Sequence, residues 1–476
     1  MNNIYRLLST FVVLVLLLGA CTDDFEETNT DPNQPIVVPA ENLFTQAQFA
    51  LADRMWGRAM NFEFAMLMVQ HFSQNEYAED SRYNQNPSTF NVSWQSFYAS
   101  GLNDLAEAKT LTENNETISE AVRNNRLAQI AILRVWAFQM VTDIWGDVPY
   151  SQALQPEEFP NPVYDSQQSI YSGLISEING AIARITPDEA GFGNGDIIYG
   201  GDMALWGRFA NSVKLRIGMR MADVASSEAS TIVSEALSSS LGVISSNAQN
   251  AEFVFNSDQR IANPFYVDAI TRDDFAISAE LAIAMADKDD PRLAEYAMPN
   301  PNGEIVGLPY GLTDAASFQL KPMTSRPHDQ IKEATAPAIL MSYAEVEFFR
   351  AEAIERNFVS GSAESAFNNA VTASFNQWGL SDALAGQYLA DNSYDAANWE
   401  ESIGYEKWVA LYTQGIEAWA EQRRLDEPEL ELPADAVTSF IPVRAFYPAV
   451  EAEANAENLS AIGFNNMEEN VWWDVQ

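Results

Sequence analysis

The chain has 476 residues, which is long enough for one large domain or for two to three domains of ordinary size. Asp and Glu number 67 against 26 Lys and Arg, a net charge of −41, which excludes nucleic-acid binding and polybasic membrane binding because both require a cationic surface. The single cysteine excludes an intramolecular disulfide, and the two histidines, His71 and His328, exclude a metal site built on three imidazoles.

The N-terminal residues have the pattern of a bacterial lipoprotein signal. Arg6 supplies a positive charge, residues 7–20 are almost entirely apolar, and the small residues Gly19 and Ala20 precede Cys21. This apolar run is too short to cross a hydrocarbon core of ~30 Å as a helix. We therefore expect residues 1–20 to be a signal peptide and Cys21 to carry a lipid, whereas an ordinary signal peptide that happens to contain a cysteine is the alternative.

Residues 21–40 are predicted to form the lipidated cysteine and a flexible tether. The segment is polar and contains prolines, so it has little to bury in a core. Its acidic residues 23–27 follow Cys21 closely and resemble a surface-export signal of lipoproteins. Residues 41–476 are then expected to form a single domain.

Hydrophobic periodicity predicts a long helix from residue 118 to residue 144. Apolar side chains recur there at three-and-four spacing, Gly146 stands where a C-terminal cap belongs, and Pro149 prevents continuation. Trp145 should end this helix with its indole packed inward.

A second helix is predicted from Asp202, as its N-cap, to about residue 224. Arg208, Arg216 and Arg220 lie on a face other than the apolar one. In so acidic a chain, we expect these arginines to hold carboxylates of neighbouring helices and not an anionic ligand.

Further helices are predicted at 336–357, 363–377 and 405–424. The first two are joined by a short turn and form a helix-turn-helix unit of about 34 residues, the length of a tetratricopeptide repeat. The stretch from about 251 to 335 is rich in Pro, Asn and Asp and is predicted to be an irregular insertion between helical parts at 41–250 and 336–476. Long ordered loops are often functional, so this insertion and the loops near 73–93 are where we expect a site.

The chain contains no motif of a known catalytic or cofactor site. It has no G-x-S-x-G, no H-E-x-x-H and no G-x-x-x-x-G-K, and the glycine-rich residues 191–195 follow a helix end and are read as a turn. We expect no cofactor and no metal. With 67 carboxylates, a glycosidase pair is not excluded by composition.

Short motifs distributed along the chain resemble those of the SusD/RagB family of Bacteroidetes outer-membrane nutrient-binding lipoproteins, in the SusD-like type 2 branch. Each motif is weak by itself, but together they run in order over nearly the whole chain. Besides Cys21 they are residues 29–35 (NTDPNQP), 143–150 (DIWGDVPY), 206–211 (WGRFAN), 290–293 (DPRL), 343–352 (YAEVEFFRAE), 374–379 (SFNQWG), 441–448 (IPVRAFYP) and Asn455.

The resemblance implies an all-α, tetratricopeptide-like helical-repeat scaffold with long irregular loop insertions. It also implies a lipid-anchored protein of the outer membrane, facing the cell exterior, that captures an oligosaccharide, or in some members a peptide. Such a protein passes its ligand to a SusC-like TonB-dependent transporter and is not an enzyme. A surface glycoside hydrolase and a pure interaction protein that touches no ligand are the competing hypotheses.

The ligand-binding candidates are aromatic and polar residues in two segments whose family counterparts converge over the ligand. Sugar rings stack on aromatic faces, and their hydroxyl groups need polar side chains as partners. The alternative for each residue is that it only pins its loop to the scaffold. The candidates are Tyr77, Arg82, Tyr83 and Trp94 in the first segment, and Phe265, Tyr266, Arg272 and Asp273 in the second.

Overall fold

The computed structural model describes residues 38–475. The predicted signal peptide, Cys21 and the tether up to residue 37 lie outside the described residues. Residues Ala40–Gln476 form one compact unit.

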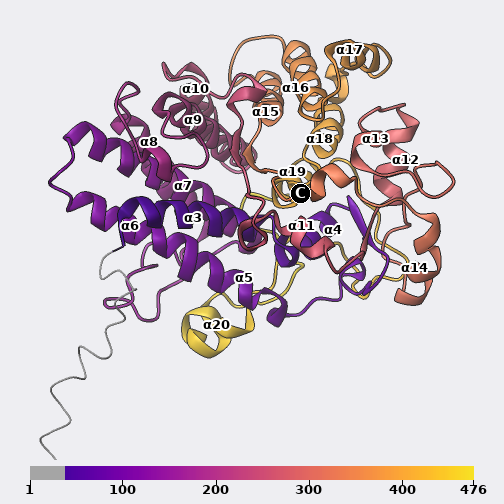
Figure 1. The fold of residues 1–476 in the computed structure, drawn as a ribbon, viewed down its shortest axis with the longest axis horizontal. Helices are drawn as coiled ribbons and strands as arrows, with labels where there is room; N and C mark the ends of the chain where they lie inside the picture. The colour runs from indigo at the N-terminus through magenta and orange to yellow at the C-terminus, as the bar shows by residue number, and fades with distance from the viewer. Residues whose placement is uncertain (1–37, 476) are drawn as a thin grey trace, which may run out of the picture. The chain divides into compact units, whose positions relative to one another are not determined.

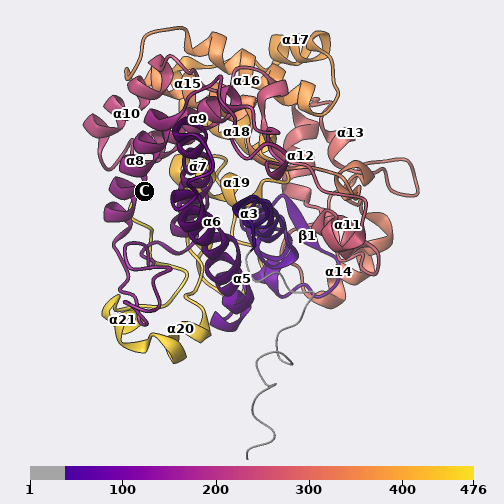
Figure 2. The same cartoon turned by 60° about the vertical axis from the view of Figure 1, so that its left-hand side comes forward.

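The scaffold consists of consecutive helices that pack in pairs (Figures 1 and 2). The pairs α7–α8 and α9–α10 lie on the left of Figure 1, and α15 to α18 lie along its top. Neighbouring pairs contact each other through α8 with α9, α9 with α15, and α15 with α18. These helices are α7 (Glu120–Trp145), α8 (Gln167–Arg184), α9 (Met203–Arg220), α10 (Ser226–Ser238), α15 (Tyr343–Glu355), α16 (Ala363–Gln377), α17 (Asp382–Asp391), α18 (Trp399–Ala410) and α19 (Gly415–Leu425).

The remaining elements are shorter and surround this scaffold. They include two two-stranded antiparallel sheets, β1 with β3 and β2 with β4. Two π-helical segments lie in the N-terminal part: Arg58–Ala65 runs directly into α4, and Phe97–Leu102 joins α5 to α6. The other helices are α3 (Ala40–Met55), α4 (Met66–Met68), α5 (Asn91–Ser96), α6 (Asn103–Glu113), α11 (Pro264–Ala269), α12 (Ala279–Asp287), α13 (Leu293–Tyr296), α14 (Asp314–Leu320), α20 (Ala449–Ala454) and α21 (Ala456–Ala461), and the strands are β1 (Phe72–Gln74), β2 (Ala251–Phe253), β3 (Phe275–Ile277) and β4 (Ala338–Met341).

The mostly helical class and several predicted helices are confirmed. Helix α7 begins after Ser119, whose hydroxyl accepts from the Val122 amide at 3.2 Å, and ends at Gly146, whose φ of 80° favours glycine. Asp202 caps α9 by accepting from the Ala204 and Leu205 amides at 3.0 Å. These helices begin where a side chain satisfies an otherwise unpaired amide.

Two predicted helices are wrong in part. Residues Ala338–Met341 form strand β4 instead of the first turn of a helix, and the helix that follows begins only at Tyr343. The predicted helix 405–424 is divided into α18 and α19, because Thr413 adopts a left-handed φ of 75° between them. A Cβ atom at Gly415 would lie 2.5 Å from Asn61 Oδ1, so the start of α19 requires glycine.

The hydrophobic core lies between the helix pairs, and Trp145 is fully buried in it as predicted. Its indole Nε1 donates to the Phe446 carbonyl at 2.9 Å. Among residues 38–475, only α7 is long and apolar enough to span a membrane, and 89% of its most apolar stretch is buried inside the protein. Helix α7 therefore has the burial of a core helix.

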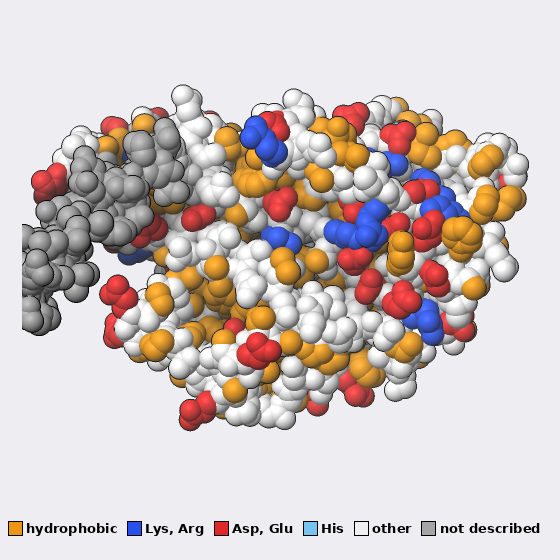
Figure 3. Space-filling view, turned by 60° about the horizontal axis from the view of Figure 1, so that its bottom comes forward, with side chains coloured by type: hydrophobic (Ala, Val, Ile, Leu, Met, Phe, Trp, Pro, Cys, Tyr) orange, Lys and Arg blue, Asp and Glu red, His pale blue; other side chains and the backbone are white. Residues whose placement is uncertain are grey.

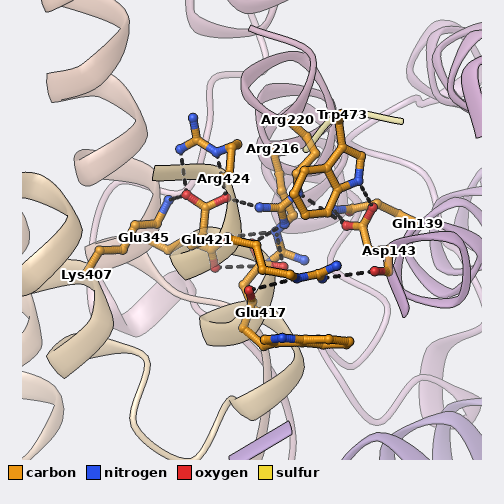
Figure 4. A network of polar contacts seen from close by, with 12 residues as sticks. Gln139, Asp143, Arg216, Arg220, Glu345, Lys407, Glu417, Glu421, Arg424 and Trp473 are labelled. Atoms are coloured by element: carbon orange, nitrogen blue, oxygen red, sulfur yellow. Dashed lines mark hydrogen bonds and ion pairs between the residues drawn. The ribbon is translucent and has the colours of Figure 1, made fainter. Parts of the chain in front are cut away.

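A buried network of charged side chains joins α9, α15, α18 and α19 (Figure 4). Arg220 of α9 contacts Glu417 and Glu421 of α19, and Arg424 bridges Glu421 to Glu352 of α15 at 2.5–2.6 Å. Burial alone would raise the pKa of Glu421, but the surrounding cations lower it well below its usual range.

The prediction that the arginines of α9 hold carboxylates is confirmed for Arg216 and Arg220. Arg208 instead donates to the Val243 carbonyl at 3.0 Å.

Candidate functional site: a pocket beside the loop insertion

The pairing of β1 with β3 brings the two predicted site segments together. Phe72 faces Ile277 and Gln74 faces Phe275 in this antiparallel pair. The chain thus places the loop after β1 next to the loop before β3, although the two are about two hundred residues apart in sequence. Of the predicted candidates, Tyr77 and Arg272 meet at this junction.

A cavity of about 430 Å³ lies beside this junction. Its walls carry aromatic side chains from the turn after α3, the first π-helical segment, β1, α11 and the residue after α16, and its remaining lining is mostly neutral. A concave, largely apolar site with a few polar groups is the usual form of a small-ligand site. The lining residues are Trp56, Asn61, Phe62, Met66, Phe72, Glu252, Asn263, Phe265, Gln330, Ile331, Glu333, Thr335, Ala336, Pro337, Ile339, Gln377, Trp378 and Thr413.

The two asparagines of the pocket hold the backbone around it. Asn61 donates to the Thr413 carbonyl at 2.9 Å and accepts from the Gly415 amide at 3.0 Å. Asn263 donates to the Ala336 carbonyl at 3.0 Å, and its Oδ1 caps the short helix α11. Because both amides are already satisfied, their role is to shape the pocket.

Two other polar groups of the pocket retain bonding capacity. The Nε1–H of Trp378 is buried and has no acceptor among residues 38–475. The Glu252 carboxylate accepts one hydrogen bond, from Asn250 Nδ2 to Oε1 at 3.2 Å, and burial raises its pKa. The pocket therefore offers a ligand the Glu252 carboxylate as an acceptor beside aromatic walls, whereas the Trp378 Nε1–H is shielded from solvent.

A charged rim adjoins the pocket at Phe265, which also lines a smaller cavity of about 240 Å³. In this rim Arg58 binds Asp268 at 2.8 Å and Asp274 at 2.7 Å. Burial would lower the pKa of Arg58, but its carboxylate neighbours raise it. In Figure 3, Lys and Arg side chains on the face shown gather in the right-hand half, among Asp and Glu side chains.

Beyond this rim, exposed rings stand among paired charges. Tyr77 is 59% exposed and adopts a left-handed φ of 57°, and the guanidinium of Arg272 lies 5.5 Å from its ring centre. Phe318 of α14 is 58% exposed, and Lys321, which follows α14, binds Glu76 at 2.5 Å. Phe318 was missed at the sequence level because a single ring in an irregular segment gives no periodic signal.

Three of the predicted ligand residues belong to the core, which corrects their assignment as stacking platforms. Tyr83 is 1% exposed and accepts from Gln70 Nε2 at 3.3 Å. Trp94 is 4% exposed, and its Nε1 donates to Glu451 at 3.0 Å. Phe265 is 6% exposed and packs 4.3 Å from the Phe62 ring, although one side of it still lines the pocket. Tyr83 and Trp94 line neither the pocket nor the smaller cavity, so their rings serve the core.

Of the other candidates, Arg82 holds a loop in place, whereas Arg272 and Asp273 form ion pairs at the charged rim. Arg82 donates from Nε to the Asp435 carbonyl at 2.7 Å and thereby fixes a later loop. Arg272 binds Asp274 at 2.7 Å and also covers Tyr77, and Asp273 binds Arg326 at 2.6 Å.

Tyr266 is half-buried in α11. Within residues 38–475 no group of three or more His, Cys, Asp or Glu residues is placed to hold a metal ion.

The comparisons with known proteins agree with this architecture. The family model of SusD-like proteins described as "Starch-binding associating with outer membrane" matches residues 32–448, so the chain belongs to this family. No curated protein sequence gives a significant match.

Solved structures with the same fold cover nearly the whole chain. A structure titled "chitin-binding protein" has a TM-score of 0.82 and 26% identity, and covers 92% of this chain and 100% of its own. A SusD homologue from Bacteroides uniformis has a TM-score of 0.80 and 26% identity, with 91% and 99% covered. A chitin-binding SusD homologue from Flavobacterium johnsoniae has a TM-score of 0.80 at 21% identity, with 91% and 99% covered, a likeness of fold.

Proposed function

We propose that this protein captures an oligosaccharide in the aromatic pocket and passes it to a SusC-like TonB-dependent transporter of the outer membrane. The observation that carries the proposal is the 430 Å³ cavity, whose lining combines five aromatic side chains with the Glu252 carboxylate. The apolar face of a pyranose ring can pack on such walls, while one of its hydroxyl groups donates to the carboxylate. The chitin-binding relative supports a saccharide as the ligand class.

The anchoring part of the proposal rests on the sequence. A lipid on Cys21 would hold the protein at the outer membrane, and the polar residues that follow would give the domain reach toward the cell exterior. The family description, which associates starch-binding proteins with the outer membrane, supports this location.

Binding without turnover is also part of the proposal. The pocket lining contains two carboxylates, Glu252 and Glu333, and a glycosidase would use such a pair as acid and as base or nucleophile. Incubating the purified protein with oligosaccharides and following product formation separates capture from hydrolysis. We expect the oligosaccharide to be recovered intact.

Ligand binding in the pocket is tested by filling its entrance with a larger side chain. Thr335 lines the pocket and is exposed, so Thr335→Trp should fill the entrance without disturbing the core, and Thr335→Ser is the matched control. Titration calorimetry with chitin, starch and peptide oligomers should show saccharide binding that Thr335→Trp abolishes and Thr335→Ser retains.

Undiminished saccharide binding by folded Thr335→Trp would show that the pocket is not the ligand site. Binding of peptides alone would show that the ligand class is not saccharide. Co-purification with the transporter without affinity for any oligomer would indicate a pure interaction protein.

A further inference from the structure

The carboxylate of Glu252 lacks the kind of partner that buried carboxylates of the scaffold have. Glu345 binds Arg216, Glu352 binds Arg424, and Glu406 binds Arg292 at 2.5–2.7 Å. Glu252 forms no ion pair with any residue from 38 to 475, and its one hydrogen-bond donor is the neutral Asn250 side chain. These three core acids each have a cationic partner, and the acid of the pocket has none among the described residues.

The surroundings of Glu252 favour a cation from outside the protein. No Lys, Arg or His lines the pocket, and a second carboxylate, Glu333, stands at its exposed side. Burial without a counter-charge raises the pKa of Glu252, so a bound cation would remove part of the cost of ionising it.

The aromatic walls of the pocket also favour a bound cation. Trp56, Phe62 and Trp378 line the same cavity, and the faces of such rings attract ammonium groups through their quadrupoles. A carboxylate combined with aromatic faces is a common chemistry for holding an alkylammonium in a partly desolvated site.

The cations of the neighbouring rim are already engaged. Arg272 binds Asp274 at 2.7 Å, and Arg326 binds Asp273 at 2.6 Å. The charge of these arginines is therefore balanced by carboxylates of the rim itself, in a protein with a net charge of −41.

We propose that the pocket selects ligands carrying a primary ammonium group, which binds between the Glu252 carboxylate and the aromatic walls. This inference rests on the proposed function of the pocket as the ligand site. The ammonium could belong to a sugar whose amine is not acetylated or to the amine of a peptide, and uronic acids would be repelled by the two carboxylates.

The test compares three probes by titration calorimetry, at a pH that keeps the amines protonated. These are a glucosamine tetrasaccharide, its fully N-acetylated counterpart and tetralysine. The glucosamine tetrasaccharide should bind about tenfold or more tightly than the acetylated one, and Glu252→Gln should remove about a tenfold difference. Glu107→Gln changes the net charge equally on exposed α6, away from the pocket lining, and should leave all three affinities unchanged.

The possible outcomes separate this inference from the proposed function. Equal binding of both saccharides, unaffected by Glu252→Gln, would overturn ammonium selection and leave oligosaccharide capture standing. If only tetralysine binds, and Glu252→Gln abolishes that binding, ammonium selection is supported and oligosaccharide capture is refuted. Because Glu333 is exposed, Glu333→Gln provides a second variant that leaves the buried side of the pocket intact, and it should weaken ammonium binding by a smaller factor.

Discussion

Arg216 and Glu345 form a two-point ion pair inside the protein. Nε of Arg216 donates to Oε1 at 2.7 Å and Nη2 donates to Oε2 at 2.8 Å, and both side chains are buried. The pair joins α9 to α15, two helices from different pairs of the scaffold. Its geometry matches the planar fork of a guanidinium to the two oxygens of a carboxylate.

Removing one member of this pair should lower the stability of the protein. Arg216→Met leaves the Glu345 carboxylate buried without its partner, and we expect the free energy of unfolding to fall by about 3–5 kcal/mol in urea titrations. Arg350→Met removes a cation that is 33% exposed and pairs with Glu347, so it should cost about 1 kcal/mol or less. The double variant Arg216→Met, Glu345→Leu should recover much of the loss, and a double variant as unstable as the single one would contradict this account.

Trp145 should contribute to stability through packing. Its side chain is fully buried and touches the rings of Trp94, Phe90 and Phe97, so Trp145→Ala would leave a cavity that costs about 3–5 kcal/mol. A thermal melt followed by circular dichroism measures this, and Trp145→Phe should cost less. An unchanged melting temperature in Trp145→Ala would show that the site relaxes around the smaller side chain.

Exposed and buried tyrosines of one loop should behave differently. Tyr77→Ala removes an exposed ring and should weaken oligosaccharide binding about two- to twelve-fold if the rim takes part in stacking, with stability unchanged. Tyr83→Ala removes a buried ring, so its main effect should be a lower free energy of unfolding. Calorimetry and urea unfolding on both variants separate the two effects, and unaltered affinity in folded Tyr77→Ala would remove the rim from the ligand site.

The stability of the loop after β1 should depend on pH through Asp80. Burial raises the pKa of Asp80 to about 7, and its one side-chain donor, Gln74 at 3.1 Å, only partly offsets this. Since the folded-state pKa lies above the unfolded value of 3.8, the stabilisation is fully present below pH ~4 and is lost as the pH rises to about 7.

In Asp80→Asn this loss should disappear. The stability of the variant relative to the natural protein should therefore increase from pH 4 to pH 7 and then level off. Urea midpoints that differ by the same amount at every pH would contradict the assignment.

The proposed lipid anchor is tested at Cys21. Cys21→Ala should abolish lipid attachment and release the protein from the membrane fraction, which metabolic labelling and fractionation measure. Cells lacking the transporter are the right background, because binding to that partner could retain an unlipidated protein. Retention in such cells would show a second means of attachment.

Local signals in the sequence were sufficient for much of the fold. The caps of α7 and α9 and the limits of α16 depend on neighbouring residues, and the scarcity of cations indicated the role of Arg216 and Arg220 correctly. The division between α18 and α19 could not be predicted, because Thr413 is no typical helix breaker.

The site was less predictable because burial depends on contacts between distant segments. Trp94 has the sequence context of a loop aromatic, yet its indole bonds Glu451, more than three hundred residues later. Glu252 has no sequence signal at all, and its significance comes from the absence of a cation around it among the described residues. Trp378 lies in the 374–379 motif of the family, the signal that could have identified it.

The charge network also constrains the order in which the chain can fold. Asp143 of α7 accepts hydrogen bonds from Tyr171 and from Trp473 Nε1, the latter at 2.8 Å. It also forms an ion pair with Arg220, which pairs in addition with Glu417 and Glu421. Until residues beyond 400 have emerged during synthesis, Arg220 lacks Glu417 and Glu421, and this part of the buried network cannot form. The buried network around Arg220 is therefore completed only by residues from the last part of the chain.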